Sequence, residues 1–172
     1  MTPKAIWLTG LSGSGKSTIA MQIYEALKRQ NHPVYILDGD VLRTGLNKNL
    51  GFSEADRTEN IRRTAEVARL MVDAGTTVIA ALISPYDQDR QTARTLFLPN
   101  QFFEIYINTP VEVCMQRDPK GLYARALKGE IKNFTGIDAP YEIPEKADLI
   151  LDTQKHSAGD LAQKVLDAIC PI

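Results

Sequence analysis

The chain has 172 residues, of which 44% are hydrophobic, and this length and composition predict one domain over residues 1–172 with a substantial core. Twenty Lys and Arg nearly balance 21 Asp and Glu, which excludes an overall positive field that would draw the protein to nucleic acid or to an anionic membrane. Cys114 and Cys170 form no metal-binding or disulfide spacing, and the N-terminus lacks a signal peptide or membrane helix, so we expect a cytoplasmic protein.

Short apolar runs alternate with longer stretches of helical periodicity, a pattern typical of parallel βαβ units. We therefore predict an α/β fold with a five-stranded, mostly parallel sheet flanked by helices. In chain order, the predicted strands are Ala5–Thr9, Val34–Leu37, Thr77–Ile83, Phe102–Ile107 and Leu149–Leu151, and the predicted helices between and after them are Lys16–Gln30, Glu54–Ala74, Gln88–Leu96, Val111–Arg117 and Gly159–Ile169. Because ligands bind at the carboxyl edge of such sheets, the loops after the first three strands should share one site.

The first predicted strand leads into a complete G-x-x-x-x-G-K-[ST] phosphate loop, which narrows the fold to the P-loop NTPase type. Glycine backbone N–H groups surround phosphate oxygens in such a loop, the lysine reaches the β and γ phosphates, and the hydroxyl after it is a Mg²⁺ ligand. We expect bound ATP to contact Gly10, Leu11, Ser12, Gly13, Ser14, Gly15, Lys16, Ser17 and Thr18, with Ser17 also binding Mg²⁺.

The loop after the second strand carries two carboxylates, Asp38 and Asp40, on either side of Gly39. Beside a phosphate loop they can divide the chemistry, with Asp38 near Mg²⁺ and Asp40 accepting a proton from the attacking hydroxyl. Read in isolation, the same residues would be a solvated Asp-Gly turn. The nearby nucleotide site favours the functional interpretation.

The next segment places Phe52 before a helix whose first turns carry Arg57, Asn60 and Arg63 on neighbouring faces. Arginine forks suit phosphate or sulfate oxygens, and an aromatic ring suits a purine face. The alternative is an ordinary solvated helix surface with Arg–Glu pairs.

The third loop has Ser84 where many P-loop proteins carry a magnesium-binding Asp, so the acidic partner of the metal must come from Asp38 or Asp40, or reach the metal through water. Farther along, residues 118–141 are too long and polar for a simple connection. We predict that they form a mobile lid that excludes water, so that ATP is not hydrolysed.

Taken together, these segments resemble the adenylylsulfate kinase (APS kinase) family from Ile6 to about Thr153. The resemblance rests on Trp7–Gly13, Asp38–Asp40 with Arg43, Gly51–Arg63, Ile83–Tyr86, Arg117–Tyr123 and Phe134–Asp138. It implies transfer of the γ-phosphate of ATP to the 3′-hydroxyl of adenosine 5′-phosphosulfate, with Lys16, Asp40 and Ser84 in catalysis.

The resemblance also implies two binding sites. The adenylylsulfate site would comprise Asp40, Val41, Leu42, Arg43, Phe52, Arg57, Asn60, Ile83, Ser84, Lys120 and Phe134, with the two phenylalanines stacked on opposite faces of the substrate adenine. Arg117 and His156 would lie beside the adenine of ATP. Family members have been described with a phosphoserine at the position of Ser84, but no neighbouring base in the sequence would activate it, and direct transfer needs no covalent step.

By the same resemblance we expect a homodimer supplied with adenylylsulfate by a separate ATP sulfurylase. Two alternatives remain: a catalytically weak, nucleotide-binding regulatory homologue, and a P-loop kinase for another small molecule. A GTPase-like switch is disfavoured, because Asp118–Gly121 lies too late for the D-x-x-G motif and Glu145 lacks the amide needed to read guanine.

Overall fold

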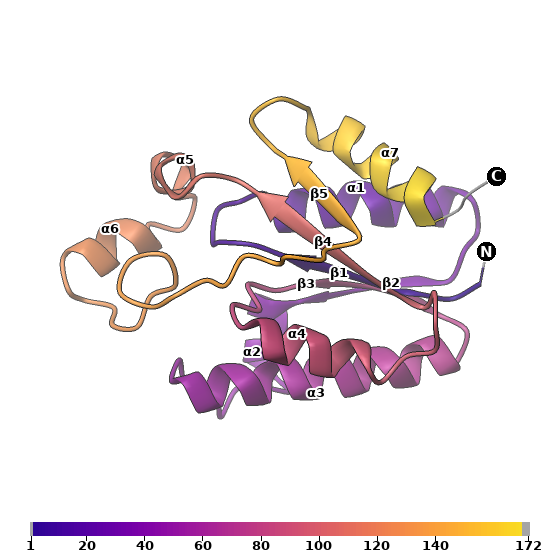
Figure 1. Ribbon diagram of the computed structural model, residues 1–172, viewed down its shortest axis with the longest axis horizontal. Helices are drawn as coiled ribbons and strands as arrows, with labels where there is room; N and C mark the ends of the chain where they lie inside the picture. The colour runs from indigo at the N-terminus through magenta and orange to yellow at the C-terminus, as the bar shows by residue number, and fades with distance from the viewer. Residues whose placement is uncertain (1, 170–172) are drawn as a thin grey trace.

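The computed structural model describes residues 2–169, in which five parallel strands form one sheet in the order β2-β3-β1-β4-β5 (Figure 1). The strands are β1 (Ala5–Thr9), β2 (Val34–Asp38), β3 (Thr77–Ala81), β4 (Phe102–Asn108) and β5 (Leu149–Asp152). The helices are α1 (Lys16–Arg29), α2 (Gly39–Thr44), α3 (Glu54–Asp73), α4 (Asp87–Arg94), α5 (Val111–Arg117), α6 (Leu122–Leu127) and α7 (Ala158–Ile169).

The central strand β1 is buried on both faces, and its alternating side chains build two separate cores. Ile6 and Leu8 belong to the core formed with α1 and α7, whereas Ala5 and Trp7 belong to the core formed with α3 and α4. Figure 1 shows these helix pairs on opposite faces of the sheet. Helices on both faces are the arrangement that a parallel sheet requires, and they explain why the strands read as continuous apolar runs.

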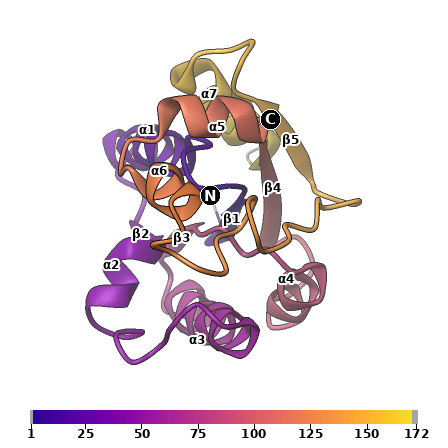
Figure 2. The ribbon, with the colours of Figure 1, turned by 90° about the vertical axis from the view of Figure 1, so that its left-hand side faces the viewer.

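The strand register brings the loops of the predicted site to one edge of the sheet. Leu8 of β1 pairs with Ala81 of β3 and with Ile105 of β4, so the carboxyl ends of these strands lie side by side. Helices α5 and α6 extend beyond this edge, and Figure 2 looks onto it. The site therefore lies at the carboxyl edge of the sheet, as predicted.

Two short helices were not predicted. The six residues of α2 follow Asp38, whose side chain accepts a hydrogen bond from the Asp40 N–H at 2.9 Å and caps a helix where the sequence indicated only a turn. Helix α6 lies inside the predicted lid, where Tyr123 and Ala126 pack with Cys114 and Phe134.

Elsewhere the predicted elements are confirmed to within two residues at each end. Differences of two residues occur at the ends of α4 and β3; β3 ends at Ala81 because the chain then bends toward Ser84, a residue with a φ of 41°. Ser53 caps α3 as expected, accepting a hydrogen bond from the Asp56 N–H at 3.2 Å. Between residues 2 and 169, no helix combines the length and the apolar character needed to cross a membrane.

Candidate active site

The phosphate loop connects β1 to α1 through glycine conformations that other residues rarely adopt. Gly10 has a φ of 152°, and a Cβ there would lie 2.8 Å from the Ile107 carbonyl oxygen. Gly15, directly before α1, has a φ of 109°. The tight turn ends at the N-terminus of a 14-residue helix, where backbone N–H groups favour a bound anion.

Lys16 is buried at the first turn of α1, and its ammonium group lies within the phosphate loop. Its Nζ donates hydrogen bonds to the carbonyl oxygens of Gly10 at 2.9 Å and Leu11 at 2.7 Å. Burial lowers the pKa of Lys16 from 10.5 to about 8, because the charged form is removed from water. A phosphate group held at the loop would offset this desolvation.

Ser17 and Asp38 lie together at the end of β2, as predicted for a Mg²⁺ site. Ser17 Oγ donates to Asp38 Oδ2 at 2.8 Å. Residues 2–169 contain no group of three His, Cys, Asp or Glu side chains that could hold a metal ion. One carboxylate and one hydroxyl beside a phosphate loop fit Mg²⁺, which commonly keeps several waters and is bound by one or two carboxylates together with the phosphates of a nucleotide.

Asp40 is exposed in the first turn of α2 and forms an ion pair with Lys120, 80 residues away. Lys120 lies between α5 and α6, so the pair joins the fixed edge of the sheet to the predicted lid. The structure thus brings two separately predicted site residues together. An exposed carboxylate next to a phosphate site is available to accept a proton from a bound hydroxyl.

The two predicted adenine-binding rings line the same cavity, but they differ in their surroundings. Phe52 is 53% exposed and lies under the guanidinium of Arg43, 4.2 Å from the ring centroid. Phe134 is 8% exposed and packs against the edge of Tyr123 with a centroid distance of 4.9 Å. Phe134 is therefore held by its neighbours, whereas Phe52 is open to a ligand.

Arg57 links the segments that carry these two rings. Its Nε donates to the Phe52 carbonyl oxygen at 3.1 Å, and its Nη2 donates to the Asn133 carbonyl oxygen at 2.6 Å. The side chain is 7% exposed and still lines the cavity. Arg57 thus has a structural role in addition to the anion-binding role predicted from the sequence.

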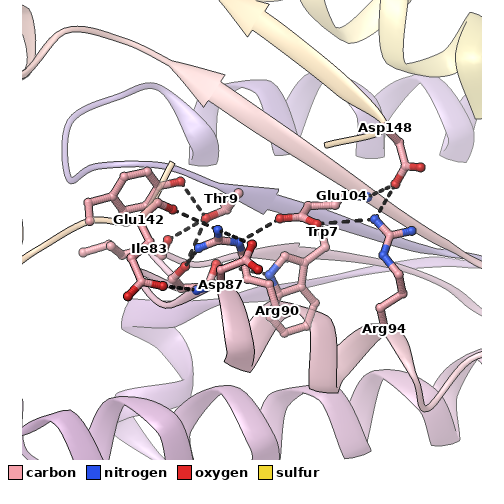
Figure 3. Close-up of polar contacts among 11 residues, drawn as sticks. Trp7, Thr9, Ile83, Asp87, Arg90, Arg94, Glu104, Glu142 and Asp148 are labelled. Carbon is pink, nitrogen blue, oxygen red and sulfur yellow. Dashed lines mark hydrogen bonds and ion pairs between the residues drawn. The ribbon is translucent and has the colours of Figure 1, made fainter. Parts of the chain in front are cut away.

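Ser84 is buried beneath the cavity, and its hydroxyl accepts a hydrogen bond from Trp7 Nε1 at 3.1 Å. Its carbonyl oxygen accepts from Thr9 Oγ1 at 3.3 Å and from Arg90 Nη1 at 2.8 Å (Figure 3). Within the described chain, no carboxylate or imidazole hydrogen-bonds to Ser84 Oγ. This geometry is that of a positioned residue, because an activated serine nucleophile needs a base in contact with it.

Arg117 and His156 lie at the end of the cavity next to α1. Arg117 Nη1 donates to the Ser14 carbonyl oxygen and to Thr153 Oγ1, each at 3.2 Å, and so ties α5 to the phosphate loop. His156 is exposed, with its Nε2 lying 3.0 Å from Lys164 Nζ. Both residues line the cavity that contains the phosphate loop, and their contact with the ATP base stays a prediction.

Most of the predicted site residues line one cavity of about 790 Å³. Of the predicted site residues, its walls contain Ser12–Thr18, Asp38, Asp40, Arg43, Phe52, Arg57, Asn60, Ile83, Ser84, Arg117, Lys120, Phe134 and His156.

Four predicted residues are not in the cavity wall. Gly10 and Leu11 begin the phosphate loop, and their carbonyl oxygens accept hydrogen bonds from Lys16 Nζ. Val41 is 64% exposed, and Leu42 packs against the core beside α3, because the short helix α2 turns both side chains away. The prediction that these two side chains line the acceptor site is not supported by this geometry.

Asn47 is a site-supporting residue that sequence reasoning missed. It is fully buried, and its Nδ2 donates to Asn60 Oδ1 at 2.8 Å, which leaves the amide nitrogen of Asn60 free for other partners. Asn47 lies in the turn region between α2 and α3 and belongs to no recognisable motif. Nothing in the sequence marks it out, since its role depends on the packing of α3.

Comparisons with known proteins agree with this geometry. The family described as "Adenylylsulphate kinase" matches residues 2–152. The chain is 55% identical to an adenylyl-sulfate kinase of Geotalea daltonii, over 95% of this chain and 81% of the relative. It is 56% identical to the bifunctional enzyme NodQ of a Rhizobium strain over 97% of this chain, but this match spans 25% of NodQ.

A solved structure is similar over nearly the full length. The Mycobacterium tuberculosis APS kinase CysC, in complex with AMPPNP and APS, is 48% identical with a TM-score of 0.94, covering 98% of each chain. That related protein, which has the same fold, is therefore in complex with an ATP analogue and APS at the same time.

Proposed function

Because the chain belongs to the adenylylsulfate kinase family, we propose that it transfers the γ-phosphate of ATP to the 3′-hydroxyl of adenosine 5′-phosphosulfate. The products are 3′-phosphoadenosine 5′-phosphosulfate and ADP. The observation that carries the proposal is that a phosphate loop, a carboxylate pair and two aromatic rings line a single cavity. The family also favours adenylylsulfate over other small-molecule acceptors.

The phosphate loop supplies the donor side of the reaction. Backbone N–H groups of residues 13–17 and the Lys16 ammonium would bind the β and γ phosphates and stabilise the charge of the transferring group. Arg117 and His156 would contact the ATP base from the α1 side of the cavity. Ser17 and Asp38 would hold Mg²⁺, which when bound neutralises phosphate charge.

The acceptor side is assigned to the residues near α2 and α3. Asp40 would take the proton of the 3′-hydroxyl as that oxygen attacks phosphorus in line, so no covalent intermediate on Ser84 is needed. Phe52 and Phe134 would enclose the adenine, with stacking worth about 1–3 kcal/mol per ring. Arg43, Arg57, Asn60 and Lys120 would supply donors to the phosphosulfate and ribose.

Residues 118–141 would close over both substrates as a lid. Tyr123 Oη donates to the Ser12 carbonyl oxygen at 2.9 Å, which places the lid next to the phosphate loop. Closure would exclude water and limit the hydrolysis of ATP. We further propose a cytoplasmic homodimer that takes its substrate from a separate ATP sulfurylase, and light scattering after size-exclusion chromatography tests the dimer.

The direct experiment measures ADP formation with adenylylsulfate, AMP, shikimate or no acceptor. We expect rapid, Mg²⁺-dependent ADP formation with adenylylsulfate only, together with 3′-phosphoadenosine 5′-phosphosulfate in equal amount. Binding of both ligands without turnover would instead identify a regulatory homologue. The intact side chains of Lys16, Ser17, Asp40 and Arg57 favour the enzyme.

A further inference from the structure

Arg90 of α4 is fully buried, yet its guanidinium donates hydrogen bonds to four residues, two of which lie in distant parts of the chain (Figure 3). Its Nε donates to Glu104 Oε1 at 2.7 Å, and its Nη1 donates to the Ser84 carbonyl oxygen at 2.8 Å. Its Nη2 donates to Asp87 Oδ1 at 3.1 Å and to the Glu142 carbonyl oxygen at 2.8 Å. The bond to Glu104 pairs the buried positive charge with a carboxylate. The other bonds reach the loop after β3, the start of α4, and the chain that follows the predicted lid.

Two of these contacts matter for the reaction because of where they lie. Ser84 belongs to residues 82–86, the loop between β3 and α4 under the acceptor side of the cavity, which we call the acceptor loop. Glu142 directly follows residues 118–141, so it is the root of the predicted lid. The Glu142 N–H also donates to the Pro85 carbonyl oxygen at 2.8 Å, and its Oε2 accepts from the Asp87 N–H at 2.6 Å. The lid root is thus fastened to the acceptor loop with Arg90 at the centre.

Neighbouring aromatic and hydroxyl groups reinforce the same junction. Tyr141 Oη lies 2.9 Å from Thr9 Oγ1, which in turn donates to the Ile83 carbonyl oxygen at 2.7 Å. The Tyr141 ring stacks on Tyr106 with a centroid distance of 6.0 Å. The end of β1 that begins the phosphate loop is therefore joined to the lid root as well.

Arg94, one turn later on α4, provides a natural comparison. Its Nη2 lies 3.3 Å from Glu104 Oε2 and 2.7 Å from Asp148 Oδ2, and its Nη1 donates to the Phe102 carbonyl oxygen at 3.3 Å. Arg94 therefore shares the carboxylate of Glu104 with Arg90 but contacts neither the acceptor loop nor the lid root. A comparison of variants at the two positions can therefore distinguish an effect on the reaction from an effect on folding.

We propose that Arg90 is a positioning residue for phosphoryl transfer, holding the Ser84 loop beneath the acceptor and the root of the lid against that loop. This inference rests on the proposed function. Arg90 contacts neither substrate; it acts through the Ser84 and Glu142 carbonyl oxygens. A buried ion pair alone is weak evidence for stability, but a planar fork that satisfies four acceptors fixes geometry that a lysine cannot reproduce.

The test compares Arg90→Lys with Arg94→Lys, both of which keep the positive charge. We expect Arg90→Lys to raise the KM for adenylylsulfate by about tenfold, the loss equivalent to one charge-assisted hydrogen bond, and to lower kcat, with the Kd for ADP unchanged. Arg94→Lys should retain wild-type kinetics. Equal kinetic changes in both variants would show that Arg90 only stabilises the fold.

A second readout needs no turnover. Trp7 is the single tryptophan of the sequence, and its indole N–H donates to Ser84 Oγ at 3.1 Å, so its fluorescence reports on the acceptor loop. Ser84→Ala supplies the reference spectrum for the lost hydrogen bond. Emission of Arg90→Lys should move toward that spectrum, while Arg94→Lys keeps the wild-type spectrum. Unchanged emission in Arg90→Lys would overturn the proposal, even if the wild-type protein phosphorylates a different acceptor.

If Arg90→Lys does not fold, the exposed side chain of Glu142 tests the junction between lid root and acceptor loop, although Arg90 itself binds the main-chain carbonyl oxygen of Glu142. Glu142→Ala removes the bond from the lid root to the Asp87 N–H and leaves the buried Arg90–Glu104 pair intact. It should raise the KM for adenylylsulfate several-fold, while Glu145→Ala, at an exposed carboxylate on the same segment, should not. Wild-type kinetics in both would overturn the part of the proposal in which the Glu142 side chain fastens the lid root to the acceptor loop. Failure of the wild-type protein itself to use adenylylsulfate would count against the proposed function only.

Discussion

Replacing Lys16 by Met should abolish phosphoryl transfer and at the same time stabilise the free protein. Lowering the lysine pKa from 10.5 to about 8 corresponds to about 3 kcal/mol of unfavourable free energy for the charged form in the folded state. Methionine removes that penalty but leaves the Gly10 and Leu11 carbonyl oxygens without their donor, at about 1 kcal/mol each. The net expectation is a gain of about 1 kcal/mol near neutral pH.

The pH dependence gives this prediction a sign that can be checked. Below the folded pKa of about 8, Lys16 is charged in both the folded and unfolded states, so the wild type carries the full penalty. As the pH rises from about 8 toward 10.5, the folded lysine loses its proton first, and the wild type gains stability relative to the variant. The advantage of Lys16→Met should therefore shrink over this interval.

Urea unfolding of both proteins at several pH values measures this difference directly, and ADP formation with adenylylsulfate measures turnover. Subtracting the two unfolding free energies at each pH removes the contributions of other titrating groups. A variant less stable than the wild type near neutral pH, or a difference that stays constant up to about pH 10, would refute the reasoning. Retained turnover would refute the catalytic role of Lys16.

Three further predictions concern the acceptor side. Asp40→Asn should lower kcat by about 10²–10⁴ with little change in ADP binding, whereas Asp38→Asn should raise the Mg²⁺ concentration needed for activity; exchanged phenotypes would reverse the two roles. Ser84→Ala should retain measurable activity, and a trapped phosphoenzyme in the wild type together with an inactive, folded variant would contradict this. Phe52→Ala and Phe134→Ala should each raise the KM for adenylylsulfate more than the KM for ATP. The double variant should lose less free energy of substrate binding than the sum of the two single variants. Additive losses would show that the two rings do not share one adenine and serve only in packing.

The phosphate loop and the position of the predicted site at the carboxyl edge of the sheet followed from local rules. The glycines from Gly10 to Gly15 are required by backbone geometry, and a buried strand before them leaves a single arrangement at the sheet edge. Ser17 and Asp38 follow a similar rule. The strands before them, β1 and β2, both pair with β3 in parallel, so their carboxyl ends lie at the same edge of the sheet. Sequence reasoning identifies a site reliably when one short motif contains both the residues that bind the ligand and the glycines that the backbone geometry requires.

The features that sequence reasoning missed depend on contacts between distant segments. Asn47 and Arg90 look like ordinary polar residues, and their roles exist only because folding places Asn60, Glu104 and Glu142 around them. Helix α6 was missed for a related reason. Its six residues are too few for a clear periodic pattern, and it is stabilised by tertiary packing.

The small core under the predicted lid has a consequence for how this segment would move. Cys114, Tyr123, Ala126 and Phe134 are buried together, so α6 and the Phe134 turn pack on α5, which Arg117 ties to the phosphate loop. Within residues 118–141, α6 and the Phe134 turn would move together, because their side chains are close-packed and transmit displacement. On closure of the predicted lid, Phe134 would then contact the acceptor at the same time as Lys120 takes its place beside Asp40. Closure would thus couple adenine binding to completion of the site, and the chemistry would begin only after water has been displaced.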